Sequence, residues 1–352
     1  MTNKTINDGI ERMRRFRKIV LEHPRLGDIR KKIRWMLDDT KSVVDDNEAE
    51  RIAARGRPIK FEEMWLLPII GPSGAMKSTS IRKVLQEINA DEAFPADDIP
   101  VLFVTMREVK NTRAFLGVVL EQYGDAAKDV IPKSGPIDAQ LVSRAIYHIA
   151  RRKRTVLLII DEAHEMLRHD GGKVGKSMAM LIKSMLNEGV FSIVMLGTDE
   201  VLNLFHISKE LKNRCVPEER VTLEAFDIKS AKDRVYFFKF LKRLEDEMVA
   251  AGVVDHALGW VDTLEDRAKV YDMCEGVLGV ACRVLRMALE RAFRDGRGSL
   301  EWSDIESAFR AFNRNQTKPG FDPFAEGPNK STLGRLKAEA EAKNKRGGKE
   351  AA

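Results

Sequence analysis

The sequence predicts an α/β fold, an αβα sandwich with a parallel sheet, followed by a helical domain. Three observations carry this prediction. The apolar run 65–70 leads into a glycine-containing turn at 71–79 and then into helical spacing. A second continuous apolar run, 156–160, is typical of a strand buried on both faces of a parallel sheet. After residue 226 strand patterns vanish and helical periodicity dominates.

The turn at 71–79 has the composition of a phosphate-binding loop. Its small residues let successive backbone N–H groups converge on a polyphosphate at a helix N-terminus. We expect Lys77 to reach the β- and γ-phosphates of ATP, and the Ser78 hydroxyl to bind Mg²⁺. The usual pattern has Gly directly before the Lys, but here the residue is Met76, which favours nucleotide binding over fast hydrolysis. The expected nucleotide contacts are Gly71, Pro72, Ser73, Gly74, Ala75, Met76, Lys77, Ser78 and Thr79.

Two carboxylates end the second apolar run, at the edge where open α/β sheets bind ligands. We expect Asp161 to hold the Mg²⁺ shell and Glu162 to activate the attacking water as a general base. The alternatives are a chance glycine turn for the first motif and helix-capping acids for the second. Together the two motifs predict a P-loop ATPase of the ASCE class, with ATP and Mg²⁺ as cofactors.

Further strands and helices complete the predicted core, residues 61–225. We expect strands at 101–106 and 191–198, and helices at 115–123, 139–152 and 177–187.

Two residues near the fourth strand are candidates for sensing or stabilising the γ-phosphate. Thr198 ends that strand, where a sensor would reach between the carboxylates and the phosphate, although a strand exit or helix cap explains it as well. Arg214 follows where oligomeric ATPases place an arginine finger, which stabilises transition-state charge on a neighbouring subunit's nucleotide. A surface salt bridge is the alternative for Arg214, and Arg220 is a rival for the finger.

Regions outside the core carry the excess positive charge. Residues 1–60, a predicted basic helical segment, hold 16 Lys and Arg against 10 Asp and Glu. Residues 314–352, a predicted flexible basic tail, hold 9 against 5. Positive charge at both ends of the chain suggests a polyanion partner. The alternative is that both segments are solvated arms without a partner. The segment Phe321–Phe324 is either a partner-docking motif or part of a tail without a partner.

The helical region 226–313 is predicted to form a lid over the nucleotide. Arg283 begins one of its helices, and a cation there is a second sensor candidate that closes onto the phosphates. Cys215, Cys274 and Cys282 have no metal-ligand spacing and indicate reduced thiols. With no apolar run long enough to span a membrane and no signal-peptide pattern, a cytoplasmic protein is expected.

The chain resembles the TniB/TnsC family of AAA+ transposition regulators, with the phage Mu B protein as a more distant relative. The likeness covers roughly residues 20–225. It rests on His23-Pro24-Arg25, the loop 71–79, the stretch 157–165, Asn187-Glu188, Leu196-Gly197-Thr198-Asp199 and Asn213-Arg214. Arg283 lies four residues after Gly279, where the common second-sensor spacing is three.

The resemblance implies an ATP-dependent, DNA-binding homo-oligomer that assembles as a ring or filament on duplex DNA. It would link a target-selection protein to the transposase, with slow ATP hydrolysis. Loops after the second and third strands usually face the channel of such rings. Here they carry Arg107, Lys110, Arg113, Lys173 and Lys176, which predicts sequence-non-specific phosphate contacts and steep salt dependence.

Two other functions share some of these features. A helicase-loader or clamp-loader-like remodelling ATPase has the same fold but uses ATP to move a partner. A P-loop kinase is the third reading, and the paired Asp161 and Glu162 argue against it because they suit water activation.

Overall fold

The computed structural model describes residues 3–22, 24–91, 94–128, 138–167, 173–215, 220–314 and 320–350. The chain divides into two compact units, Arg25–Leu223 and a second that joins Met1–Pro24 to Glu224–Ala352. The predicted boundary at residue 60 is therefore not where the chain divides. Residues from Arg25 onward belong with the sheet, and the residues before them belong with the C-terminal helices.

A five-stranded parallel sheet forms the centre of the first unit, in the order β2-β3-β4-β1-β5. The strands are β1 (Leu66–Ile70), β2 (Val101–Thr105), β3 (Leu157–Asp161), β4 (Ser192–Gly197) and β5 (Val221–Thr222). Every residue of β1, β3 and β4 is buried. These are the continuous apolar runs of the sequence, and burial on both faces is the reason for their lack of alternation.

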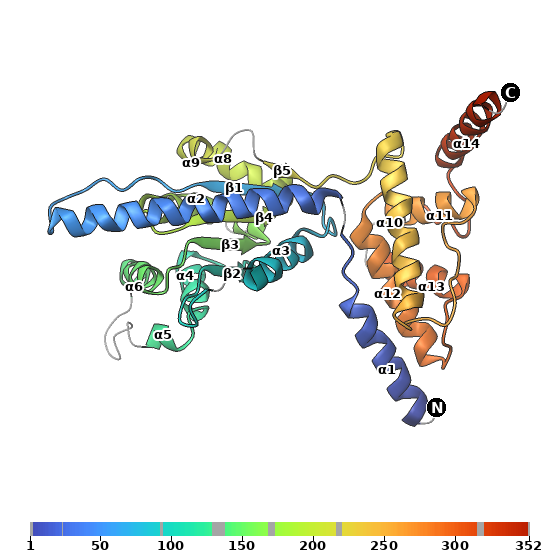
Figure 1. The fold of residues 1–352 in the computed structure, drawn as a ribbon, viewed down its shortest axis with the longest axis horizontal. Coiled ribbons are helices and arrows are strands. Elements are labelled where there is room, and N and C mark those ends of the chain that lie inside the picture. The colour runs from blue at the N-terminus through green and yellow to red at the C-terminus, as the bar shows by residue number, and fades with distance from the viewer. Residues whose placement is uncertain are drawn as a thin grey trace. The chain divides into compact units, whose positions relative to one another are not determined.

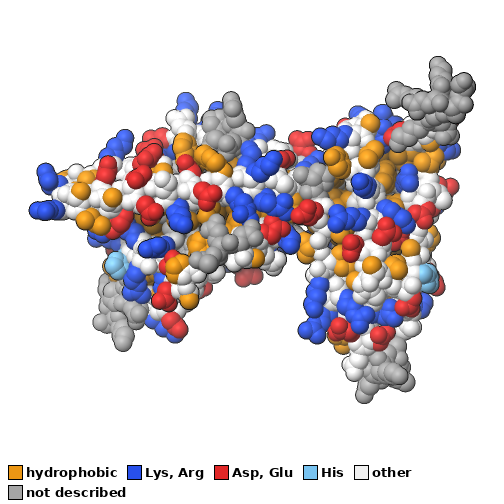
Figure 2. All heavy atoms as spheres, in the orientation of Figure 1, with side chains coloured by type: hydrophobic (Ala, Val, Ile, Leu, Met, Phe, Trp, Pro, Cys, Tyr) orange, Lys and Arg blue, Asp and Glu red, His pale blue; other side chains and the backbone are white. Residues whose placement is uncertain are grey.

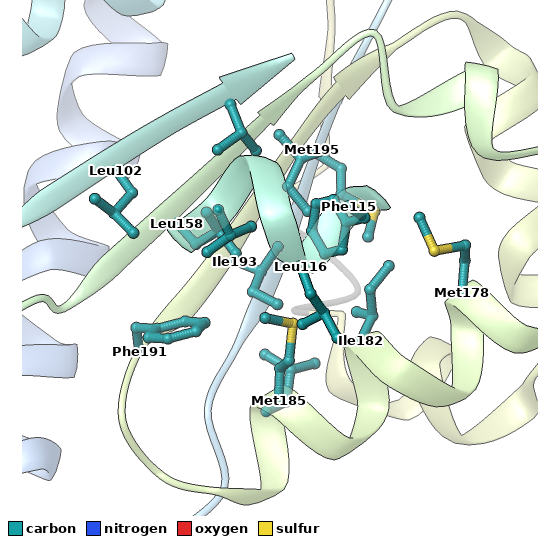
Figure 3. Packing of buried hydrophobic residues seen from close by; sticks show 14 of the residues in the cluster. Leu102, Phe115, Leu116, Leu158, Met178, Ile182, Met185, Phe191, Ile193 and Met195 are labelled. Atoms are coloured by element: carbon teal, nitrogen blue, oxygen red, sulfur yellow. The ribbon is translucent and has the colours of Figure 1, made fainter. Parts of the chain in front are cut away.

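Helices cover both faces of this sheet (Figure 1). On one face α2 (Pro24–Ala54) and α3 (Lys77–Asp91) pack against it, with Ile29, Ile33 and Ile81 fully buried. On the other face lie α4 (Thr112–Glu121), α6 (Ala139–Arg152) and α7 (Lys173–Asn187). Figure 3 shows this second layer, where Phe115 and Leu116 of α4 and Ile182 of α7 meet strand residues. Shorter elements are α5 (Asp125–Lys128), η1 (Ala163–Leu167), η3 (Asp199–Leu202), α8 (Asn203–Ile207) and α9 (Lys209–Arg214).

Helix α2 is fixed to the sheet by polar contacts as well as by its apolar face. The Thr40 hydroxyl donates to Ser192 Oγ of β4 at 2.6 Å. The Asn47 side chain donates to the carbonyls of Glu62 and Gly189 and accepts from the Glu62 N–H. Figure 2 shows basic and acidic side chains interspersed along the exposed side of α2. This side of α2 therefore carries charges of both signs, although it belongs to the segment 1–60 that is predicted to be basic.

The second unit is helical, as predicted. It contains α1 (Asn3–Lys18), α10 (Ala231–Ala250), α11 (Leu264–Cys274), α12 (Leu278–Arg294), α13 (Trp302–Asn313) and α14 (Lys330–Glu350). Helix α1 packs on α12, and Arg12 donates to the carbonyls of Val253 and Gly298 and pairs with Asp255 at 2.9 Å. At least one arginine of the basic N-terminal segment therefore serves internal packing.

Part of the predicted tail folds against this unit. Leu336 of α14 is buried, and the Thr332 hydroxyl donates to Asp272 at 2.7 Å. Arg234 pairs with Glu339 at 2.7 Å. The Phe324 ring lies 5.6 Å from that of Phe309, so the motif expected to bind a partner contacts its own chain. The prediction missed this because a helix of few apolar residues becomes stable only when another surface covers them.

Two further observations concern the cysteines and the length of the apolar helices. Cys215, Cys274 and Cys282 are unpaired, and burial raises the pKa of each thiol to about 12. Among the described residues, no helix is long and apolar enough to cross a membrane.

Candidate nucleotide-binding site

The loop between β1 and α3 is shaped by backbone requirements at three positions. A Cβ on Gly71 would lie 2.4 Å from the Leu223 carbonyl oxygen, so only glycine fits there. Gly74 has a φ of +85°. Met76 has a φ of +61°, in the left-handed region that costs an ordinary residue about 1–2 kcal/mol. Glycine is the usual residue before the Lys for this reason, and Met76 adopts the same backbone under strain.

Lys77 begins α3 with its ammonium group turned back into the loop. Its Nζ donates to the carbonyls of Gly71 at 2.8 Å and Pro72 at 2.9 Å. Burial lowers the pKa of this lysine below its ordinary value, despite the nearby charges of Glu162, Asp161 and Asp199. The amine is thus held at the centre of the loop, the place from which it would reach a polyphosphate.

The two predicted Mg²⁺ ligands lie in direct contact. Ser78 Oγ donates to Asp161 Oδ1 at 2.8 Å, although 83 residues separate them. A hydroxyl and a carboxylate are the oxygen ligands that Mg²⁺ prefers, and it takes its remaining ligands from water and substrate phosphates. The described residues contain no cluster of three or more acids, His or Cys that could hold a metal by itself. The pair therefore fits a magnesium ion that arrives with a nucleotide.

Glu162 follows on a strained backbone. Its φ of +56° ends β3 abruptly, and the chain turns into the short helix η1. Its N–H donates to Asp161 Oδ1 at 3.0 Å, and its side chain is 38% exposed. Strain of this kind concentrates at functional sites, where neighbouring structure holds it in place. The carboxylate is accessible to water beside the magnesium ligands, as a general base requires.

Thr198 and His164 complete this edge of the sheet. Thr198 follows β4, which pairs with β3, and its hydroxyl is buried without a hydrogen-bond partner among the described residues. His164 Nε2 lies 3.5 Å from Glu162 Oε2 and 3.6 Å from Glu165 Oε1. The sequence assigns no role to His164, because its side chain comes near Glu162 only through the local fold of η1.

Comparison with protein families gives a match to the family described as AAA domain, over residues 66–205. This range runs from β1 to α8 and contains both phosphate-site motifs. The fold is that of an AAA+ P-loop NTPase. Within this AAA+ core, Lys77, Ser78, Asp161, Glu162 and Thr198 come together at the carboxyl edge of the sheet.

Comparison with solved structures gives three similarities, of which the first supports the fold. The ORC2 protein of Aeropyrum pernix in its ADP form matches with a TM-score of 0.51 at 15% identity, over 80% of this chain and 70% of that one. The Aeropyrum pernix ORC1 protein in complex with DNA gives 0.49 at 16% identity, over 80% and 65%. Cdc6p from Pyrobaculum aerophilum gives 0.45 at 14% identity, over 69% and 59%. No curated protein matches the sequence.

Arg214 is held inside its own AAA+ core. Its side chain is only 9% exposed and pairs with Glu63 at 2.8 Å. The residue makes a salt bridge, as in the alternative interpretation, but it is buried and not on the surface. Arg220 lies beside β5 and is exposed. Which of the two acts as an arginine finger stays a prediction.

Arg283 lies in the helical unit, at the start of α12. Its guanidinium lies 5.8 Å from the centre of the Phe312 ring. Its contact with nucleotide stays a prediction.

The predicted DNA-contacting residues that the structure describes are exposed. Arg107, Lys110 and Arg113 surround a turn after β2, which buried Val109 anchors to the AAA+ core. Lys176 is exposed in the first turn of α7, so it lies on a helix and not in the predicted loop. None of these four makes an ion pair or side-chain hydrogen bond with another described residue. Lys173 begins α7, and its side chain lies outside the described residues.

Proposed function

We propose that the chain binds and hydrolyses ATP and, in the ATP-bound state, assembles on duplex DNA as a regulator of DNA transposition. The single observation that carries the ATPase part is the hydrogen bond between Ser78 and Asp161, with Lys77 and Glu162 at the same edge. The AAA domain match and the likeness to a solved protein in its ADP form support nucleotide binding. The transposition role rests on the sequence resemblance to TniB/TnsC regulators.

The side chains have separable tasks in hydrolysis. Lys77 leaves the carbonyls of Gly71 and Pro72 to bind the phosphates, which replace those oxygens as acceptors. Ser78 and Asp161 would hold Mg²⁺, which neutralises charge on the phosphates. Glu162 accepts a proton from water as the water oxygen attacks the γ-phosphorus. The bond between the γ-phosphorus and the bridging oxygen breaks, giving ADP and phosphate.

Slow hydrolysis follows from two features of the site. The loop before Lys77 contains a strained Met76 in place of glycine, so the loop must hold phosphates while it carries this strain. Glu162 is also oriented by a strained backbone. Small misplacements of a base or of a phosphate reduce the rate by large factors, about 100-fold for 1 Å. A slow hydrolase is suited to a switch that stays assembled on DNA between turnovers.

Duplex binding is proposed for the exposed cations around the turn after β2. Their side chains make no ion pairs with described residues and are available for backbone phosphates. Each phosphate contact releases condensed counterions, so affinity falls steeply with salt.

The first experiment measures ATP turnover and DNA assembly together, by phosphate release and by electron microscopy with an ATP analogue and duplex DNA. Wild type is expected to assemble only with nucleotide, and to turn over slowly. Lys77→Ala should abolish assembly, because the phosphates lose their main cation. Glu162→Gln should bind ATP, reduce hydrolysis by about 100-fold or more, and lengthen the life of DNA-bound oligomers.

Four outcomes contradict the proposal. Equal assembly on DNA without nucleotide removes the ATP switch, and a shorter-lived Glu162→Gln oligomer removes Glu162 as the base. Fast turnover without stable assembly favours a loader-like remodelling ATPase instead. A cognate transposase whose DNA joining is indifferent to the ATP-bound oligomer contradicts the transposition role.

The second experiment tests the DNA surface by the salt dependence of affinity. Arg107→Ala should weaken duplex binding uniformly across sequences and reduce the slope of log affinity against log salt by about 1. Arg154→Ala is the matched control, since Arg154 is equally exposed but lies at the opposite end of the sheet, before β3. An unchanged slope in Arg107→Ala, or an equal change in both variants, contradicts the assignment.

A further inference from the structure

His164 occupies an unusual place beside the predicted general base. The left-handed backbone at Glu162 turns the chain into η1, and this turn brings the His164 ring back toward the carboxylate two residues earlier. The ring is 6% exposed, and its Nε2 lies 3.5 Å from Glu162 Oε2. A second carboxylate, Glu165, lies 3.6 Å from the same nitrogen.

Two carboxylates lie close to Nε2, where an N–H has an acceptor on either side. We assign the proton to Nε2 on this ground, which leaves Nδ1 facing the end of β4. Nδ1 is buried and has no hydrogen-bond partner among the described residues.

Gly197 makes room for this ring at the end of β4. A Cβ on Gly197 would lie 2.4 Å from Val201 Cγ2, 3.1 Å from His164 Nδ1 and 3.3 Å from the His164 backbone nitrogen, so Val201 and His164 both pack against this glycine. The next residue is Thr198, whose hydroxyl is also buried without a partner in the described structure. Two unsatisfied polar atoms therefore gather around one glycine, and each such atom costs about 1–3 kcal/mol.

We propose that His164 is a positioning residue that holds the Glu162 carboxylate through its Nε2–H while its Nδ1 faces the end of β4 beside Thr198. The inference rests on the proposed ATPase function and adds a residue to it. The imidazole connects the end of β4, where the γ-phosphate is expected, to the base that activates water. Without the ring, a 38% exposed carboxylate on a strained backbone has no side-chain contact that fixes its direction.

The test compares three substitutions at one position. His164→Gln places an amide N–H near the position of Nε2, His164→Asn places one near Nδ1, and His164→Ala removes both. We expect His164→Ala to lower kcat by about 10–100-fold, the range for loss of an orienting partner, with the ATP dissociation constant changed less than threefold. His164→Gln should recover a larger part of kcat than His164→Asn.

A double-mutant cycle separates positioning from a structural role. In a Glu162→Gln background, His164→Ala should lower the residual rate by less than twofold, because the base it positions is already absent. His148→Ala is the matched control, a histidine exposed on α6 that should leave kcat unchanged.

The outcomes distinguish this inference from the proposed function. A wild-type protein that binds no ATP or releases no phosphate overturns the ATPase function and the inference with it. Normal wild-type hydrolysis with an unchanged His164→Ala rate overturns the inference alone. Should His164→Ala not fold, the two amide variants decide. An Asn variant as active as the Gln variant overturns the inference, and so does an additive double-mutant cycle between His164→Asn and Glu162→Gln.

Discussion

The carboxyl edge of the sheet and the C-terminal helical unit differ in how their buried side chains are paired. At the edge, Met76 and Glu162 carry left-handed backbones, and the buried polar atoms of His164 and Thr198 have no described partner. In the helical unit, the buried carboxylates of Glu245 and Asp304 are satisfied, although Trp260 Nε1 is also buried there without a described partner. Glu245 accepts from the N–H groups of Leu258 at 2.9 Å and Gly259 at 2.8 Å.

The difference indicates which buried polar groups are available to a ligand. Asp304, 1% exposed, receives two hydrogen bonds of 2.6 Å from Arg297 and caps α13. In such a network each polar group has a partner within the protein, which stabilises the helical unit. The edge of the sheet is complete only when a ligand supplies acceptors and donors. We therefore expect substitutions in the helical unit to change stability, and substitutions at the edge to change nucleotide chemistry.

The largest expected stability effect comes from Glu245→Ala. Two partly buried N–H groups would lose their acceptor, at about 1–2 kcal/mol each, so the free energy of unfolding should fall by about 2–4 kcal/mol. Chemical denaturation with ATP turnover measured beside it checks this. Glu245→Gln keeps one acceptor oxygen and should lose less. A loss below about 1 kcal/mol for the Ala variant would show that the helical unit tolerates unsatisfied groups as the edge does.

A smaller effect is expected from Met76→Gly. Relief of the left-handed strain contributes about 1–2 kcal/mol, and the greater freedom of glycine in the unfolded chain offsets about 0.5–1 kcal/mol of it. The net gain in unfolding free energy should be at most about 1.5 kcal/mol, with faster ATP turnover. Met76→Ala is the control, because it removes the side chain and keeps the strain. Equal gains in both variants would assign the effect to crowding by the methionine side chain.

The smallest effect concerns the pH dependence of α14 docking. Burial raises the pKa of Asp272, which accepts from the Asn329 N–H and the Thr332 hydroxyl. A raised pKa favours the protonated carboxyl in the docked state. Docking should therefore strengthen as pH falls from neutrality through the raised pKa toward the ordinary 3.8, and weaken as pH rises through that window.

Hydrogen exchange of α14 at several pH values measures this change. Asp272→Asn cannot titrate and should lose that part of the slope, while Arg234 and Glu339 remain to pair in both proteins. A wild-type slope equal to that of Asp272→Asn, or of opposite sign, would contradict the assigned direction.

The nucleotide site was predictable because its signals are local. A buried parallel strand is a continuous apolar run, and each of the two motifs directly follows such a run, as in β1 and β3. Parallel strands end at one edge, so Ser78 and Asp161 had to come close once the fold was right. Thr198 followed from the same reasoning about β4.

The missed features depend on contacts that no local pattern records. The apolar residues of α1 predict that another surface covers them, but they do not identify it. In the structure that surface is α12. Arg214 pairs with Glu63 across 151 residues, which its position after β4 could not reveal. His164 reaches Glu162 only because the latter adopts a positive φ. Helix α14 has few apolar residues, and its contacts with Asp272 and Arg234 stabilise it on the helical unit.

The close packing of Gly71 against Leu223 has a mechanical consequence. Leu223 N–H also donates to Ile70 at 2.7 Å, so the entrance of the phosphate loop and the last residue of the first unit are tied by backbone atoms alone. No side-chain rotation can absorb a displacement between them. A loop that tightens around a phosphate must therefore move Leu223 with it, so the end of β1 and the residue that follows β5 respond to a ligand as one backbone.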